Sequence, residues 1–191
     1  MAKIICGAGM SMSLDGFIND GEGSVGNLYP DFSEASQAPS FRQMLNGTGA
    51  VIMGRHVYDG MADPFLWATD GYEFQTPIFV LTHTPPAKYP LGNGKLRFTF
   101  VTDGIESAVA QAKTAAGDKN VQVLGANTTQ QCLNAGLCDE IQLGLISVLL
   151  GKGLRLLENI DTGKIQLERT KVEESTSMRT NITFKVTKAN S

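Results

Sequence analysis

The chain has 191 residues, of which 42% are hydrophobic and 18% are charged. A chain of this length and apolar content can bury a substantial core without metals or disulfides, so we expect a single domain over residues 1–191. The formal net charge of -3 offers no basic surface to nucleic acid. A nucleic-acid partner is therefore not expected.

The cysteines, Cys6, Cys132 and Cys138, are odd in number and form no CxxC pair. This usage suits a reduced cytoplasmic protein whose thiols serve as small core residues, and no metal site is expected. The first residues lack the pattern of a secretory signal, and no run of 18 apolar residues occurs. We therefore expect a cytoplasmic location and no contact with a membrane.

Hydrophobic periodicity predicts strands and helices that alternate along most of the chain. Strands are expected near residues 3–12, 50–53, 77–82, 98–101, 121–124, 140–148, 164–174 and 179–187, and helices near 36–46, 105–116 and 128–135. The last two strands have no helix between them, which predicts an antiparallel hairpin at the edge of a mixed sheet. The Gly- and Pro-containing stretches 21–39 and 61–75 are predicted to be loops that cover a site.

Residues 4–9 (IICGAG) begin like a dinucleotide-binding fingerprint, in which a strand is followed by G-x-G. Met12 stands where the third glycine should fall, and residues 10–14 continue an alternating strand pattern instead of opening a helix. We therefore interpret these glycines as positions of close backbone approach within a strand.

Residues 50–58 (AVIMGRHVY) predict a buried strand that ends at Gly54 and is followed at once by Arg55 and His56. A guanidinium at the end of a strand is well placed to bind phosphate. The alternative for Arg55 is a surface ion pair at the start of a helix. His56 and His83 are each isolated, so a packed or solvated role explains them as well as a functional one.

Residues 121–129 (VQVLGANTT) predict a strand, a sharp turn at Gly125-Ala126 and the start of a helix. The first N–H groups of such a helix lack internal partners, and the helix dipole favours negative charge in front of them. A diphosphate would fit there. The alternative is a tight corner that only needs an N-cap.

These segments, in this order, resemble the dihydrofolate reductase superfamily, and specifically its branch related to the reductase domain of riboflavin biosynthesis. Four motifs along nearly the whole chain carry the resemblance: SLDG at 13–16, GRHVY at 54–58, the Gly-Ala turn at 125–126, and the pair GLCDE and SVLLGKG within 136–153. The resemblance implies a dihydrofolate-reductase-like three-layer α/β fold. Its sheet would be mixed and mainly parallel, with about eight strands, flanking helices and a C-terminal antiparallel hairpin.

The resemblance also implies NADPH as the cofactor, because Arg55 and the hydroxyls near residues 81–84 suit a 2′-phosphate. Asp15 becomes the candidate catalytic residue, touching substrate or positioning a proton, although Asp-Gly between apolar positions is also a common turn signal. Contacts to the cofactor are implied for Gly54, Arg55, His56, Val57, Thr82, His83, Thr84, Gly125, Ala126, Asn127 and Thr128.

The expected reaction is hydride transfer to a C=N or C=O carbon of a pyrimidine- or pterin-like small molecule, with 5-amino-6-(5-phosphoribosylamino)uracil as the leading family example. The chain departs from the family in three ways. The stretch 38–42 lacks the acid that dihydrofolate reductases carry there, which Asp31 or Glu34 could replace if their loop folds inward. The turn has Gly-Ala instead of two glycines, and no deaminase motif is present.

The sequence leaves two questions open, namely whether the chain is an enzyme and whether it forms a homodimer. A non-catalytic module that keeps the fold and binds a nucleotide or heterocycle is the alternative to an enzyme, because cofactor residues are better represented than substrate residues. A homodimer is suggested by the family and by the apolar strand 141–150, which a buried core explains equally well.

Overall fold

The computed structural model of the chain describes residues 2–60, 72–90 and 92–189. Within them, nine strands form one sheet in the order β5-β4-β3-β6-β1-β7-β9-β8, and β2 pairs with β7 off this path. The strands are β1 (Ile4–Cys6), β2 (Ser11–Ser13), β3 (Thr48–Gly54), β4 (Pro77–Leu81), β5 (Arg97–Val101), β6 (Asn120–Leu124), β7 (Glu140–Ile146), β8 (Ile165–Glu174) and β9 (Arg179–Lys188). The helices are α1 (Phe32–Ala35), α2 (Pro39–Gly47), α3 (Arg55–Asp59), α5 (Ile105–Ala116) and α6 (Ala126–Asn134), with the short 3-10 turns Gly26–Leu28 and Thr162–Lys164.

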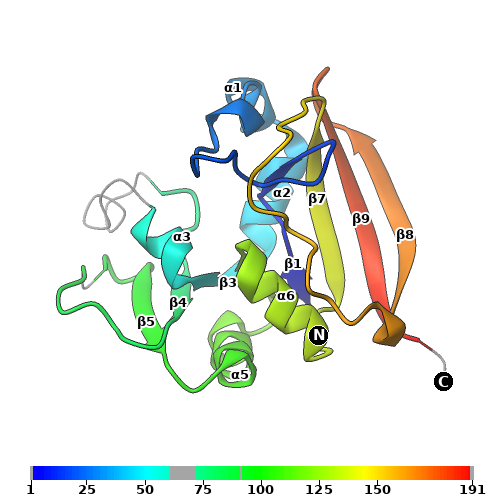
Figure 1. Cartoon of the computed structure of the whole chain (residues 1–191). Helices are drawn as coiled ribbons and strands as arrows, with labels where there is room; N and C mark the ends of the chain where they lie inside the picture. Colours follow the sequence, from blue (N-terminus) through cyan, green and yellow to red (C-terminus); the bar gives the residue numbers. More distant parts are fainter. Residues whose placement is uncertain (1, 61–71, 91, 190–191) are drawn as a thin grey trace.

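The sheet is mixed and mainly parallel, which confirms the predicted fold class. Strands β1 to β7 pair in parallel, whereas β9 runs antiparallel to both β7 and β8. The central strand β3 is apolar and almost fully buried because helices cover both of its faces. The C-terminal hairpin closes the sheet at the edge opposite β5 (Figure 1).

Helices lie on both faces of the sheet and produce three layers. Helices α5 and α6 cover one face and α2 the other (Figure 1). Helix α5 buries Ile105, Ala108, Val109, Ala112 and Ala116, a spacing that keeps one helical stripe against the sheet. No helix among the described residues is both long and apolar enough to cross a membrane.

The predicted strand 3–12 is in fact two strands separated by a bend. Gly7 and Gly9 have φ of 80° and 74°, and the Met10 N–H donates to the Gly7 carbonyl across 3.0 Å. A Cβ at Gly7 would lie 2.9 Å from the carbonyl oxygen of Gln142. The structure thus confirms close backbone approach, and no helix follows these glycines as the dinucleotide-binding fingerprint would require.

Two helix predictions needed correction. The predicted helix 36–46 begins three residues late, as α2 at Pro39, because proline biases the residue before it toward extended backbone. Helix α1 lies before the predicted helix, within the stretch 21–39 that was predicted to be a loop. Helix α3 follows β3 directly and was not among the predicted helices, although the alternative interpretation of Arg55 placed it at the start of a helix. Its five residues are too few to show a helical period.

Parallel strands place their carboxyl ends at a common edge of the sheet. At this edge β3 passes into α3 at Gly54, β6 passes into α6 at Gly125, and Gly104 begins α5 after β5. Ligands of open α/β sheets bind at such an edge.

Candidate active site

A large cavity of about 1540 Å³ opens at the carboxyl ends of the parallel strands. All eleven residues that were predicted to contact a cofactor line it: Gly54, Arg55, His56, Val57, Thr82, His83, Thr84, Gly125, Ala126, Asn127 and Thr128. They come from three strand ends that lie far apart in the chain. The volume exceeds the roughly 300–1,000 Å³ of an ordinary small-molecule pocket, so an extended dinucleotide has room.

The N-terminus of α6 forms one wall of the large cavity. Gly125 is the N-cap with φ of 94°, and no side chain caps the helix. The N–H groups of residues 126–128, in the first turn, have no partner within the helix, and the helix dipole favours negative charge in front of them. A Cβ on Gly125 would lie 2.8 Å from Cγ2 of Val57, so only glycine fits this turn. The binding of an anion at this corner stays a prediction.

Arg55 begins α3 at a second wall of the large cavity. Its Nε donates to Oδ1 of Asp59 across 2.7 Å, and its Nη1 donates to the Thr84 carbonyl across 2.9 Å. The surface ion pair that was the alternative interpretation of Arg55 is thus present, and it holds the guanidinium on the cavity wall. Arg has five N–H donors, so three remain for a ligand.

The segment after β4 faces Arg55. The Thr82 hydroxyl donates to the Thr84 carbonyl across 3.0 Å, and the Thr84 N–H donates to that hydroxyl across 3.2 Å. This local turn presents His83 and both threonines to the large cavity. A cation and hydroxyls therefore meet at one place, as binding of a phosphate requires.

Asp15 lies outside the lining of both cavities described here. Its carboxylate accepts hydrogen bonds from the Ser13 hydroxyl (2.6 Å) and from the backbone N–H groups of Leu150 (3.2 Å) and Gly151 (2.7 Å). These donors, the Ser13 hydroxyl first, lower the pKa of Asp15 to about 2. Asp15 thus ties a tight turn to the segment after β7, and its catalytic role stays a prediction.

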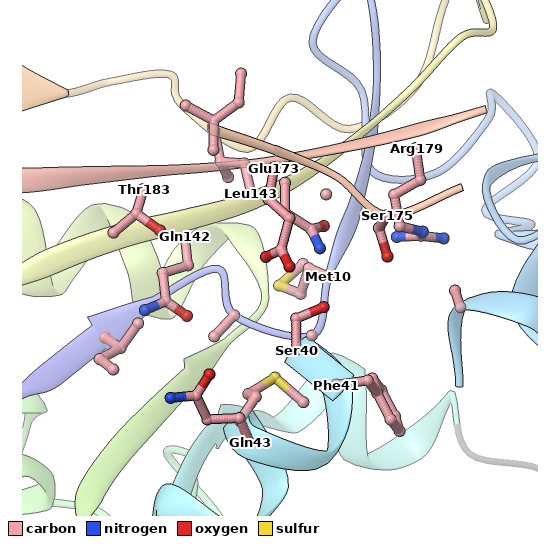
Figure 2. A pocket seen from close by; sticks show the side chains of 18 of the residues that line it. Met10, Ser40, Phe41, Gln43, Gln142, Leu143, Glu173, Ser175, Arg179 and Thr183 are labelled. Atoms are coloured by element: carbon pink, nitrogen blue, oxygen red, sulfur yellow. The ribbon is translucent and has the colours of Figure 1, made fainter. Parts of the chain in front are cut away.

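A small cavity of about 520 Å³ lies between α2 and the sheet. Figure 2 shows Ser40, Phe41 and Gln43 of α2 on one side of it, with residues of β7 and of the C-terminal hairpin across from them. Four residues line both the small and the large cavity: Gly9, Met10, Tyr29 and Glu73. Two ligands could therefore meet where the cavities join.

Asp31 does fold inward, but its carboxylate is already engaged. Arg179 binds it in a bidentate manner, with Nη2 to Oδ1 at 2.8 Å and Nε to Oδ2 at 2.9 Å, and the Thr176 hydroxyl donates to Oδ2 at 2.7 Å. The Arg179 guanidinium holds the pKa of Asp31 below its ordinary value despite burial. Asp31 is therefore ionised at neutral pH and cannot donate a proton, and Glu34 is exposed on α1.

Glu73 is the carboxylate that sequence reasoning missed at the junction of the cavities. It follows segment 61–71, which lies outside the described residues, so the loop prediction for 61–75 can be followed only at its end. Desolvation raises the pKa of Glu73 and holds that of neighbouring Tyr72 well above its usual range. No periodic signal marks a loop residue of this kind, and only its place in the fold reveals it.

The three cysteines all lie in the core between the sheet and α6. Hydrogen bonds with Cys132 and Cys138, together with burial, raise the pKa of Cys6 well above its ordinary value. Among the described residues, no group of three His, Cys, Asp or Glu side chains could hold a metal ion.

The sheet order, the C-terminal hairpin and the two adjoining cavities define a protein of the dihydrofolate-reductase-like fold. The family model of the RibD C-terminal domain matches residues 3–180. The chain therefore belongs to the RibD C-terminal domain family. No curated protein matches the sequence.

Solved structures show the same fold. A protein from Shewanella sp. PV-4, assigned provisionally to riboflavin biosynthesis, is 23% identical over 98% of this chain and 99% of its own, with a TM-score of 0.75. The deaminase/5-amino-6-(5-phosphoribosylamino)uracil reductase of Thermotoga maritima is 14% identical over 96% of this chain and 56% of its own, with a TM-score of 0.68. Dihydrofolate reductase of Enterococcus faecalis, complexed with NADP(H), is 16% identical over 96% of both chains, with a TM-score of 0.57.

Proposed function

We propose that the chain is an NADPH-dependent reductase that transfers a hydride to a pyrimidine- or pterin-like substrate. The observation that carries this proposal is the convergence of eleven predicted cofactor residues on one cavity, which adjoins a second cavity at four shared residues. Membership in the RibD C-terminal domain family supports it. The similar structures add that the same fold occurs in a uracil reductase and in a dihydrofolate reductase bound to NADP(H).

The large cavity would hold the cofactor. The free N–H groups of residues 126–128 would receive the diphosphate, and Arg55 with Thr82 would receive the 2′-phosphate. NADPH, when bound, supplies the hydride. The protein holds two partners in contact and limits the access of water, and this positioning lowers the barrier.

The small cavity would hold the substrate beside the junction. Gly9 has no side chain, so the backbone permits close approach there, and Met10 and Tyr29 supply apolar surface. We assign Asp15 a positioning role, because its carboxylate holds the turn at residues 13–16 against the segment after β7. The remaining proton would come from water.

The proposal is tested by a titration of NADPH and NADH, monitored by nicotinamide fluorescence, followed by measurement of NADPH consumption at 340 nm with pyrimidine and pterin substrates. Saturable binding with a preference for NADPH, followed by consumption on adding substrate, would support the reductase. Binding without consumption by any tested heterocycle would favour the non-catalytic module. Absence of binding at millimolar concentration would refute the assignment of the large cavity.

We also propose a homodimer formed through the C-terminal hairpin. The side chains of Leu167 and Val172 on β8 are 50% and 53% exposed, and they lie opposite Val186 and Ile182 of β9. This gives an apolar stripe on one hairpin, as an interface between subunits requires. Light scattering behind size-exclusion chromatography should show a dimer that Leu167→Glu converts to a monomer, and a monomeric wild-type protein would refute the proposal.

A further inference from the structure

The charges around the small cavity are almost entirely paired. Its lining contains two cations, Lys171 and Arg179. The Nζ of Lys171 lies 2.8 Å from the Glu173 carboxylate. Arg179 is buried and uses Nε, Nη1 and Nη2 on Asp31 and on the Ser11 hydroxyl. Each cation is therefore balanced by a carboxylate, so neither adds a net positive charge to the lining.

The acidic side chains leave one carboxylate without a counter-charge. Three glutamates line the small cavity, at positions 73, 140 and 173. Glu140 pairs with Lys3, and Glu173 pairs with Lys171. Glu73 has no ion pair among the described residues, and it stands at the junction with the large cavity. When the charged lining residues are counted together with their ion-pair partners, Glu73 leaves a net negative charge.

The residues outside the described ranges do not change this balance. Segment 61–71 contains two aspartates and no Lys, Arg or His, and Met1, Leu91 and residues 190–191 carry no cationic side chain. No further cationic side chain from this chain can therefore reach the small cavity from those segments.

A second acceptor is among the residues that line the small cavity. Gln122 on β6 is 1% exposed, and its Nε2 donates to the Thr48 hydroxyl across 3.2 Å. Its Oε1 is buried and has no hydrogen-bond partner among the described residues. A buried amide oxygen without a partner costs free energy, so it favours a ligand that brings an N–H donor.

A phosphorylated substrate would meet unfavourable electrostatics in this cavity. A phosphate monoester carries a charge of about −1.5 to −2 at neutral pH, so a net negative charge in its surroundings opposes its binding. Among the described residues, the small cavity instead has the carboxylate of Glu73 without an ion-pair partner, and its other polar groups outside the ion pairs are neutral hydroxyls and amides. Its net charge therefore disfavours an anion.

We propose that the small cavity takes an unphosphorylated, neutral or basic nitrogen heterocycle with N–H donors, such as an aminopyrimidine or its nucleoside. This proposal rests on the proposed function and names its substrate class. The chain would then gain no rate or affinity from the phosphate of phosphoribosyl compounds, including the substrate named for the Thermotoga maritima protein.

The test uses wild-type protein saturated with NADPH, whose binding is first measured separately. Initial rates of NADPH consumption are compared for 5-amino-6-(5-phosphoribosylamino)uracil and for the same compound without its phosphate. We expect kcat/KM for the dephosphorylated compound to be equal or higher. A preference of about tenfold or more for the phosphorylated compound, which a single charge-assisted contact would produce, overturns the proposal.

Binding decides the question if turnover is too slow to measure. Calorimetry with NADPH-loaded protein should then give the same order of affinity for the two compounds. Failure of both compounds to bind overturns the substrate class while leaving NADPH binding intact. Failure of NADPH to bind instead refutes the proposed function, so the two failures are distinguishable.

A matched pair of variants isolates Glu73. Glu73→Gln should raise the relative kcat/KM or affinity of the phosphorylated compound by roughly three- to tenfold, because it removes the facing negative charge. Glu168→Gln, which removes an exposed carboxylate of β8 that lines neither cavity, should leave the ratio unchanged. An unchanged ratio in Glu73→Gln, or equal changes in both variants, overturns the assignment of Glu73 as the discriminating charge.

Discussion

Replacement of Arg55 by alanine gives the sharpest test of the large cavity. In the structure two N–H donors of Arg55 are used by Asp59 and by the Thr84 carbonyl, and three are left to face a phosphate. One charge-assisted hydrogen bond contributes about 1.5–3 kcal/mol. Its loss should weaken NADPH binding by roughly 10- to 150-fold. NADH lacks the 2′-phosphate, so its affinity should change by less than about threefold.

The substitution should cost little stability, which keeps the binding result interpretable. The Asp59 side chain is 49% exposed, so it remains solvated once its partner is removed, and an exposed pair of this type contributes at most about 1 kcal/mol. Fluorescence titrations of both nucleotides with wild type, Arg55→Ala and Arg97→Ala would measure the effect. Arg97 is exposed on β5 and lines neither cavity, so it controls for net charge. Equal losses for NADPH and NADH, or no loss at all, would refute the assignment of Arg55 to the 2′-phosphate.

Three further predictions follow from the same structure. Gly125→Ala and Gly94→Ala both place alanine at a positive φ, 94° and 92°, so each has a backbone cost of about 1–2 kcal/mol. Only Gly125→Ala adds a 2.8 Å contact, with Cγ2 of Val57, and only this variant should weaken NADPH binding in a titration. Arg179→Met should destabilise the fold by about 3–5 kcal/mol in urea unfolding, because it leaves buried Asp31 unpaired. The pKa of Asp31 in the folded state lies below its ordinary 3.8. The stabilisation of the wild-type protein by this pair is therefore complete above about pH 4 and is lost as the pH falls through the folded-state pKa. Arg179→Met should lack this pH dependence of stability. Asp15→Asn should lower kcat while the Kd for NADPH stays unchanged, and unchanged turnover would remove Asp15 from the mechanism.

The predicted elements show where a local pattern is sufficient. The buried strand 121–124 and helix 105–116 agree with β6 and α5 to within one residue, because each has an uninterrupted period of its own. The predictions of shorter elements were wrong because these elements have no uninterrupted period of their own. The bend at Gly7 divides one alternating run into β1 and β2, and α3 has too few residues to repeat an apolar position.

The two cavities differ in how far the sequence predicted them. The residues predicted to contact the cofactor lie at strand ends in short motifs, such as Gly54-Arg55 and Gly125-Ala126, which the resemblance could align position by position. The small cavity is assembled from single residues of α2, β6, β7 and the hairpin, together with Glu73 from a loop. No spacing along the chain links these residues, so the sequence contained no motif for them.

The sequence by itself determined the alternation of strands and helices and the antiparallel end of the sheet, because these depend on contacts between near neighbours in the chain. Its resemblance to a known superfamily pointed to eleven of the residues that line the large cavity. Only the tertiary structure decided which charges remain free. Asp31 meets Arg179 from a position 148 residues away, and Asp15 meets Gly151 from one 136 residues away, so both carboxylates are engaged. Within the part of the chain that the structure describes, Glu73 has no ion-pair partner and lies at the junction of the two cavities. Charge pairing is set by distance in space, which the order of residues along the chain does not reveal.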